Sequence, residues 1–331
     1  MLLTAIITTA TLRSSSPIIA YGRLLSAKRL LYSFVPNTSL ALSSRPYGVN
    51  NNNNNHQNGN KRVVILNFDD GWKSQYTNAT PILNKYGFKA TFYVVCNYIG
   101  KDESRLNWQD ISGLYKEGND IESHTMNHND LTKMSKKELE YEIGQSKQCL
   151  LDHGINNVTS FAYPFNKGAE DIAVVKVIAK YYSLARTATH PLMFLHCNVS
   201  LSNKSSLSSF SSLNQTDCRT YADNGKLNRI NRYSIIGWTH HYPQLDDSQM
   251  FNAFVDEVNS QNEFNKNGTI NAIPIIIYHR IDNTKIDYST DIGLFDSEMK
   301  YLHDNGFKVL TMADLGYDEN SKHLYIMKSG I

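Results

Sequence analysis

The chain has 331 residues, 41% hydrophobic and 11% aromatic, so it can bury a substantial core as one large domain or two small ones. Its net charge of +2 is unevenly distributed, because residues 1–68 hold seven basic and no acidic residues, which leaves −5 for the rest. An acidic body excludes nucleic-acid binding as the main role, since phosphate contacts need a basic surface.

Residues 1–60 are predicted to be a leader with an Asn-rich linker, disordered or cleaved. The first twelve residues are apolar but short, and a membrane span needs roughly 20 apolar residues. Residues 18–35 mix aliphatic and basic side chains, which suits an amphipathic helix at a membrane surface, an atypical signal or an organelle transit peptide. The Asn run 50–55 has no pattern that could pack a core.

From Arg62 onward, short apolar runs alternate with amphipathic segments. The predicted strands are 63–68, 90–95, 120–123, 159–163, 183–186, 229–236, 273–278 and 307–310. The predicted helices are 78–86, 108–117, 135–153, 171–181, 248–264 and 296–305. Strands separated by helices favour parallel pairing in an α/β barrel or a doubly wound sheet.

Titratable residues follow three of these strands. Asp69 and Asp70 follow the first strand, His124 and His128 follow the third, and His279 follows the strand 273–278. The carboxyl ends of parallel strands meet at one face, which is where α/β barrels place their sites. We therefore expect these five side chains at one mouth.

Asp70, His124 and His128 are candidate metal ligands, because carboxylate and imidazole suit Zn²⁺ and other first-row divalent ions. Histidines four apart on a helical turn point the same way. The alternative is a pair of surface histidines with a capping Asp.

Asp69 is a candidate general base. Adjacent residues of a strand face opposite sides, so Asp69 and Asp70 can share one site only if the chain turns there, and Gly71 allows such a turn. The alternative role of Asp69 is a helix N-cap.

Four segments resemble the motifs of one family. Asn67–Gly71 resembles the T-F-D-D-G motif of the polysaccharide deacetylases (the NodB homology or carbohydrate esterase 4 group), and His124–His128 resembles their H-[ST]-x-x-H motif. Phe161–Phe165 and Ile275–His279 are similar to the third and last motifs. Each motif is weak alone, but four in order are specific, and they extend the similarity from about 62 to about 315.

The resemblance implies a distorted, incomplete (β/α)7 barrel over 61–318, with a Ser/Asn-rich insert at about 187–228 and a tail at 319–331. It also implies a metal-dependent hydrolase that removes N-acetyl groups from the sugars of a polysaccharide or oligosaccharide. The alternatives are a hydrolase of another non-peptide amide and an inactive carbohydrate-binding protein. Such a substrate favours a secreted or cell-envelope location, with membrane contact through the leader, although the leader is not a clean signal peptide.

The resemblance also implies roles for further residues. His279 would be the general acid that protonates the leaving amine, and the backbone N–H of Phe165 would bind the oxyanion. Many family members carry an Arg at the start of the third motif, where this chain has Phe161. Arg186 or Arg232 could orient Asp69 instead. The fourth motif is not located; its nearest segment is 229–232.

The cysteines and some aromatic residues are less informative. Cys96 and Cys149 lie in apolar runs, which predicts free core thiols. Cys197 and Cys218 bracket the insert, either as a disulfide or as two free thiols. Trp72 and Tyr98 could stack on sugar rings or pack in the core. Four histidines outside the motifs are assigned ordinary surface or hydrogen-bonding roles: His190, His196, His240 and His241.

Overall fold

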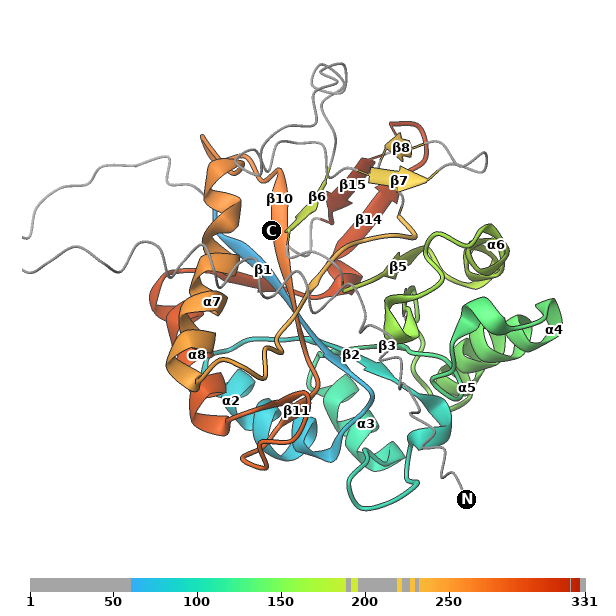
Figure 1. Ribbon diagram of the computed structural model, residues 1–331, viewed down its shortest axis with the longest axis horizontal. Helices are drawn as coiled ribbons and strands as arrows, with labels where there is room; N and C mark the ends of the chain where they lie inside the picture. The colour runs from blue at the N-terminus through green and yellow to red at the C-terminus, as the bar shows by residue number, and fades with distance from the viewer. Residues whose placement is uncertain are drawn as a thin grey trace, which may run out of the picture. The chain divides into compact units, whose positions relative to one another are not determined.

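The computed structural model describes residues 61–188, 192–195, 219–221, 227–229, 232–321 and 323–327 (Figure 1). The predicted leader, most of the insert and the proposed Cys197–Cys218 pair lie outside the described residues. Among the helices of the described part, none is both long and apolar enough to cross a membrane.

The first strand, β1 (Val63–Asp69), is the centre of the fold, and all seven of its residues are buried. It pairs in parallel with β10 (Ala272–Tyr278) on one side. On its other side it pairs with β13 (Lys308–Leu310) near its start and with β2 (Thr91–Val94) near its end. The uninterrupted apolar run of β1 follows from this position, because both of its faces are covered.

The sheet curves from β2 through three more parallel strands, β3 (Asp120–Ser123), β4 (Ser160–Ala162) and β5 (Leu184–Arg186). The next position is irregular: Ile235 bridges Arg186, and the two-residue β9 (Trp238–Thr239) pairs with β10. This segment therefore joins β5 to β10 with few hydrogen bonds. The predicted distorted, incomplete (β/α)7 barrel is confirmed.

A glycine makes the irregular segment possible. A Cβ at Gly237 would lie 2.8 Å from the Cδ1 atom of Ile277, closer than side chains tolerate. The absence of a side chain lets the segment lie close against β10.

The helices pack around the outside of the strands, as Figure 1 shows. They are α2 (Thr80–Lys85), α3 (Trp108–Lys116), α4 (Lys136–Leu139), α5 (Ser146–Asp152), α6 (Ile172–Tyr181), α7 (Asp247–Asn259) and α8 (Ile292–Asp304). Alternate residues of β1 pack into two separate hydrophobic clusters, one between the strands and the helices and one inside the barrel. Val64 and Leu66 pack with the helices, while Val63 and Ile65 pack with β10 inside the barrel.

Five segments differ from the predicted elements. The strand expected at 229–236 is divided, because 227–229 form β8 (Leu227–Arg229), which pairs with β7 (Arg219–Tyr221) in a hairpin of its own. Short strands that the pattern did not predict are β6 (Leu192–Phe194), antiparallel to β10, and the pair β11 (Arg280–Ile281) and β12 (Ser289–Thr290). The expected tail contains β15 (His323–Ile326), paired with β14 (Leu315–Asp318), and Leu324 is buried.

The prediction of free thiols at Cys96 and Cys149 is wrong, because the two residues form a disulfide. Cys96 follows β2, and Cys149 lies on α5, which packs over the neighbouring strand β3. The fold brings their Cα atoms to 6.6 Å, within the range that a disulfide spans. Apolar surroundings in the sequence gave no sign of this proximity.

Candidate active site and metal centre

Two adjacent carboxylates leave β1 in different directions. Asp69 is the last residue of the strand and, like Asn67, faces the barrel interior. Asp70 and Gly71 then adopt left-handed backbone conformations, with φ of 72° and 66°. This turn reverses the usual alternation, so that both carboxylates reach the mouth of the barrel.

The two histidines of the third strand lie on a loop and not on the predicted helical turn. Thr125 and His128 both have positive φ, which is incompatible with a helix. The carboxylate of Glu142 holds the loop by accepting hydrogen bonds from the backbone N–H groups of Met126 (3.1 Å) and Asn127 (2.9 Å). The loop therefore brings the histidines together by a route that their spacing alone did not indicate.

Asp70, His124 and His128 converge at the mouth. The Nε2 atoms of His124 and His128 lie 3.6 and 3.3 Å from Oδ1 of Asp70, and all three atoms lie within 4.8 Å of one another. A four-coordinate ion with bonds of about 2.1 Å would place neighbouring ligands about 3.4 Å apart. The spacing of this triad therefore suits one divalent cation, to which each residue would offer one atom.

The hydrogen bonding of the triad also fits a cation. Nδ1 of His124 lies 2.8 Å from the carbonyl oxygen of Ala162, which leaves Nε2 as the lone-pair atom. Oδ1 of Asp70 is buried and has no hydrogen-bond partner within the described part of the chain. Two acceptor atoms, Nε2 of His124 and Oδ1 of Asp70, thus face each other, and a metal ion would satisfy both.

The electrostatics favour neutral imidazoles beside an ionised carboxylate. Burial lowers the pKa of His124 to about 4, and burial also lowers the pKa of His128. Burial works to raise the pKa of Asp70, but the nearby His279, the two loop histidines and Arg105 outweigh it and lower that pKa. Metals bind the deprotonated forms of these groups, which are the forms that the site holds at neutral pH.

Asp69 is held by a buried ion pair. Its carboxylate accepts a hydrogen bond from the guanidinium of Arg186, at the end of β5, and both side chains are almost fully buried. The guanidinium carbon also lies 4.4 Å from the ring centre of Tyr93. Of the two predicted orienting residues, Arg186 makes this contact. Arg232 instead pairs with Glu319 at 2.5 Å.

Phe165 follows β4 and has φ of 56°, which turns its backbone toward the mouth. No acceptor for its N–H occurs among the described residues, while Asn166 and Lys167 donate theirs to Tyr163 and Pro164. This N–H is therefore free to donate to a bound oxygen. Its ring is 57% exposed and lies 4.6 Å from the ring of His128.

His279 follows β10, the direct neighbour of β1. Nε2 of Gln75 donates to the backbone carbonyls of both Asp69 (2.6 Å) and His279 (2.8 Å), which ties the two strand ends together. The ring of Tyr288 lies 4.7 Å from His279 and stacks at 4.1 Å on His241. The structure thus places His279 at the same mouth as Asp69.

Other candidates have structural roles. His240 is buried, and its Nε2 lies 2.6 Å from Oε1 of Glu298, so it belongs to a hydrogen-bonded pair in the core. Trp72 does not offer a free face to a sugar, since the guanidinium carbons of Arg105 and Arg280 lie 3.3 and 3.5 Å from its ring centre. His190 and His196 lie outside the described residues.

Most of the non-glycine residues with positive φ lie in the candidate site. Five of the eight non-glycine residues with positive φ in the described ranges belong to the site: Asp70, Thr125, His128, Phe165 and Asn166. Each such conformation costs on the order of 1–3 kcal/mol and persists where the surroundings enforce it. Sequence reasoning missed the polar residues that enforce it, Gln75 and Glu142, because each lies in a helical segment where a polar residue is ordinary.

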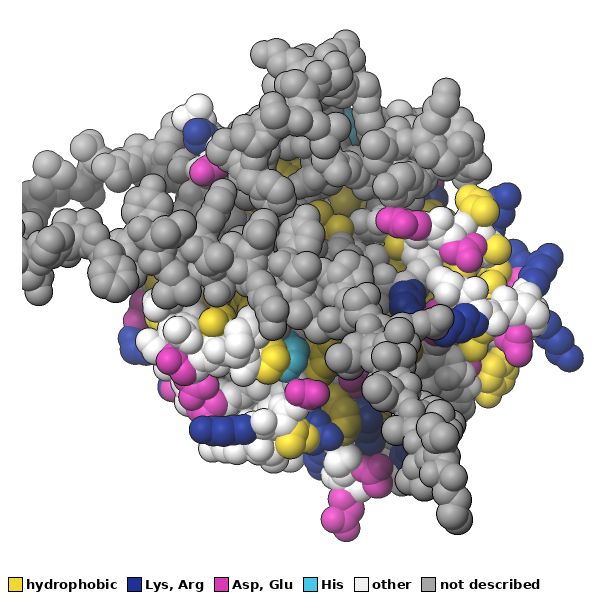
Figure 2. All heavy atoms as spheres, viewed as in Figure 1, with side chains coloured by type: hydrophobic (Ala, Val, Ile, Leu, Met, Phe, Trp, Pro, Cys, Tyr) yellow, Lys and Arg dark blue, Asp and Glu magenta, His cyan; other side chains and the backbone are white. Residues whose placement is uncertain are grey.

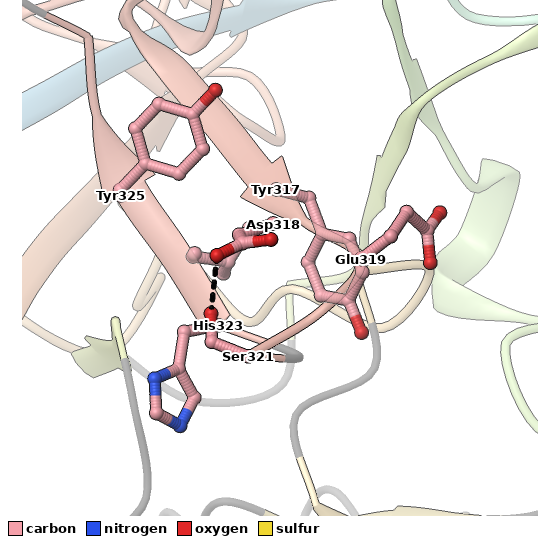
Figure 3. A pocket seen from close by; sticks show the side chains of 7 residues that line it. Tyr317, Asp318, Glu319, Ser321, His323 and Tyr325 are labelled. Atoms are coloured by element: carbon pink, nitrogen blue, oxygen red, sulfur yellow. Dashed lines mark hydrogen bonds between the residues drawn. The ribbon is translucent and has the colours of Figure 1, made fainter.

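A cavity of about 600 Å³ lies elsewhere, on the β14–β15 hairpin. Figure 3 shows Tyr317 and Tyr325 beside this cavity, and the hydroxyl of Ser321 donating a hydrogen bond to the carboxylate of Asp318. Leu315 and Leu324 of the same hairpin pack with Val63 at the start of β1, the end of the barrel opposite to the mouth. This cavity is therefore separate from the candidate site.

Comparisons with known proteins point to one family. Residues 56–182 match the family described as polysaccharide deacetylase. The poly-beta-1,6-N-acetyl-D-glucosamine N-deacetylase of Staphylococcus aureus (strain MRSA252) is 29% identical over 147 residues, which cover 40% of this chain and 51% of that protein. A second curated relative, the putative polysaccharide deacetylase YxkH of Bacillus subtilis (strain 168), is 30% identical over 111 residues, which cover 34% of this chain and 39% of that protein. The chain therefore spans about half the length, or less, of the two curated relatives.

Two solved structures are also similar. The Streptococcus pyogenes deacetylase PplD in complex with acetate is 28% identical, with 40% of this chain and 58% of that chain covered and a TM-score of 0.38. The family 4 carbohydrate esterase from Streptomyces lividans in complex with acetate is 13% identical, with 82% and 100% covered and a TM-score of 0.47. The family match and the curated relative confirm the resemblance carried by the motifs up to residue 182. Arg186 and His279 lie beyond the matched segment.

Proposed function

We propose a function on the premise that this chain belongs, over residues 56–182, to the polysaccharide deacetylase family: it hydrolyses the acetamido group of N-acetylated sugars in a polysaccharide or oligosaccharide. One observation supports this proposal above the others. The potential metal ligands Asp70, His124 and His128 converge beside a separately anchored carboxylate, Asp69, and His279 follows the adjacent strand. Amide hydrolysis needs these parts, namely a metal, a base and an acid.

The triad would hold a divalent ion, for which we propose Zn²⁺ because its ligands are two imidazoles and one carboxylate. When bound, such an ion polarises a carbonyl and makes water more acidic. Asp69 takes a proton from the attacking water as its oxygen bonds to the acetamide carbon. Arg186 keeps that carboxylate facing the mouth.

The remaining steps use the other side of the site. The Phe165 N–H donates to the carbonyl oxygen as negative charge develops on it. His279 then gives a proton to the nitrogen as the C–N bond breaks, because an amide nitrogen leaves poorly without one. The products are acetate and a free amino sugar, so one water is consumed and the protons balance.

Exposed aromatic side chains support a sugar substrate. Phe165 is 57% exposed beside His128, and Tyr288 is 45% exposed beside His279. Sugar rings present apolar C–H faces that pack on aromatic rings. These two residues replace Trp72 as our candidates for stacking, and Tyr98 is partly covered by Lys101 and Arg105.

Two alternatives remain distinct proposals: a hydrolase of another non-peptide amide, and a carbohydrate-binding protein without turnover. Both are tested by metal analysis of the purified protein together with acetate release from chitin, peptidoglycan and β-1,6-linked oligomers. Our proposal predicts one bound ion and acetate from one of these substrates. A protein that binds one ion but releases no acetate from any N-acetylated sugar would refute our proposal and favour one of the two alternatives.

Two variants separate the proposed roles. Asp70→Asn should lose the ion, while Asp69→Asn should keep it and lose about 10²–10⁴-fold of the activity, the usual contribution of a general base. Acetate release near the wild-type rate by Asp69→Asn with metal bound would remove Asp69 from that role. A polymeric substrate outside the cell would also agree with our proposal that the protein is secreted or held in the cell envelope.

A further inference from the structure

Two arginines at the mouth lie on opposite faces of one indole ring. The guanidinium carbon of Arg105 lies 3.3 Å from the ring centre of Trp72, and that of Arg280 lies 3.5 Å from it. Arg105 also lies 4.5 Å from the ring centre of Tyr98. Stacking fixes the planes of both guanidinium groups without using their N–H donors.

Those donors have few partners. Nη1 of Arg105 donates to the backbone carbonyl of Asp70 at 2.9 Å. For Arg280 the nearest side-chain carboxylate oxygen within the described ranges is Oδ2 of Asp282, at 4.0 Å, which is too long for a hydrogen bond. By contrast, Lys73 nearby is satisfied, since its Nζ lies 2.6 Å from Asp110.

Two basic side chains therefore lie together at the mouth of a domain that carries a net negative charge. Residues 69–331 carry a net −5, yet Arg105 and Arg280 stand together beside the ligand Asp70. Figure 2 shows dark blue basic side chains over the region where β11 and α3 lie in Figure 1. An ion in the triad would add to this charge.

We propose that Arg105 and Arg280 form a subsite for a carboxylate carried by the glycan, next to the sugar whose acetamido group is hydrolysed. This inference rests on the proposed function for the position of that sugar. A guanidinium edge binds a carboxylate through two parallel hydrogen bonds, and two edges on the sides of one ring offer more donors than the protein itself uses. The preferred substrate is thus an acidic glycan, such as one that alternates N-acetylglucosamine with a uronic acid.

The test compares one oligosaccharide in two forms. The probe is a hexamer of alternating N-acetylglucosamine and glucuronic acid, and its reference is the same hexamer with the carboxyl groups reduced to alcohols. Calorimetric binding to the full, metal-loaded chain should favour the acidic form by roughly ten-fold or more at low salt, the scale of one charge-assisted bidentate contact. The preference should shrink as salt is added.

Variants assign the preference to the two arginines. In Arg280→Gln the ratio of the two binding constants should fall toward one, while Arg280→Lys, which keeps the charge but not the planar fork, should retain part of it. Arg105→Gln should act in the same direction; if it does not fold, the two Arg280 variants still decide. Arg62→Gln is the matched control, because Arg62 lies at the start of β1, at the other end of the barrel, and should leave the ratio unchanged.

Three results are decisive. Equal binding of the two hexamers, or a preference that survives Arg280→Gln, would overturn the subsite. A ratio altered equally by Arg62→Gln would show a general charge effect and would overturn it as well. Acetate release, measured in parallel on the neutral substrates above, reports on the proposed function separately, so a preference for the acidic hexamer without acetate from any glycan would refute the hydrolase and keep the subsite.

Discussion

Arg186 and Asp69 are 117 residues apart in the chain and form an ion pair inside the barrel, where both side chains are almost inaccessible to water. Removing one partner of such a pair leaves an uncompensated buried charge, which typically costs about 3–5 kcal/mol. We expect Arg186→Met to lose that much free energy of unfolding, measured by urea denaturation, and to lose activity.

A double-mutant cycle separates stability from chemistry for this pair. Asp69→Asn in the Arg186→Met background removes the stranded charge, so the double variant should be more stable than Arg186→Met alone and still inactive. If the losses in free energy of unfolding of Arg186→Met and Asp69→Asn add up to the loss of the double variant, the two side chains do not interact energetically.

The loss of activity in a His279 variant should depend on the leaving group of the substrate. His279→Ala should strongly depress hydrolysis of an N-acetylated sugar, whose nitrogen needs a proton to leave. An activated aryl acetate ester should be affected much less, because its leaving group departs without one. Equal losses on the two substrates, compared by kcat/KM, would indicate that His279 positions the substrate and does not donate the proton.

Glu142 is predicted to control metal affinity from a distance. Its carboxylate accepts hydrogen bonds from the backbone of Met126 and Asn127, in the loop between the two histidine ligands. Glu142→Gln should weaken metal binding by about 10–100-fold, as loss of an outer-shell partner does. Activity should return when excess metal is supplied. Glu140→Gln, on the same helical segment but half-buried and paired with Lys180, is the control and should bind metal normally.

The pH dependence of stability should reveal Asp120. Burial raises its pKa to about 7, above the ordinary 3.8, and Asp314 adds to the shift while Thr91 opposes it. Between about pH 4 and 7 the folded protein therefore holds a proton that the unfolded chain has released. The contribution of Asp120 to the free energy of unfolding should therefore fall as pH rises through this window, by up to about 1.4 kcal/mol per pH unit, while the lowered pKa values of His124 and His128 contribute in the opposite direction.

Asp120→Asn should flatten that slope, because an amide does not titrate. The neighbouring Glu122, whose pKa is also raised by burial and by Asp120, contributes in the same direction, so some slope should remain. The exposed Asp247→Asn should leave the slope as it is. The same change of stability from pH 4 to 7 in the wild type and in Asp120→Asn would contradict the prediction.

The parts of the fold that the sequence predicts well are those with a strong local cause. The strands at 63–68 and 273–278 are apolar throughout because β1 and β10 are covered on both faces, and both were placed to within one residue. The sixth position was misplaced, because residues 232–239 hold their place with few backbone hydrogen bonds and with the close approach at Gly237. No apolar run marks such a segment.

The candidate site divides in the same way. Placement at strand ends predicted that Asp69, Asp70 and His279 share a mouth, since the carboxyl ends of parallel strands converge. The loop from His124 to His128 was expected to be helical, and its positive φ angles depend on Glu142, which lies 14 residues beyond His128. Contacts of that kind, like the disulfide of Cys96 and Cys149, come from tertiary packing and leave no local pattern.

The pairing of β1 with β10 has a consequence for any shortened form of the protein. The family match ends at residue 182, yet the strand that covers one side of β1 does not begin until Ala272. A fragment that stopped at the end of the match would leave β1 as an exposed edge strand, seven residues long and almost wholly apolar. Unprotected edges of this kind pair with other chains, so such a fragment would aggregate before it could be assayed.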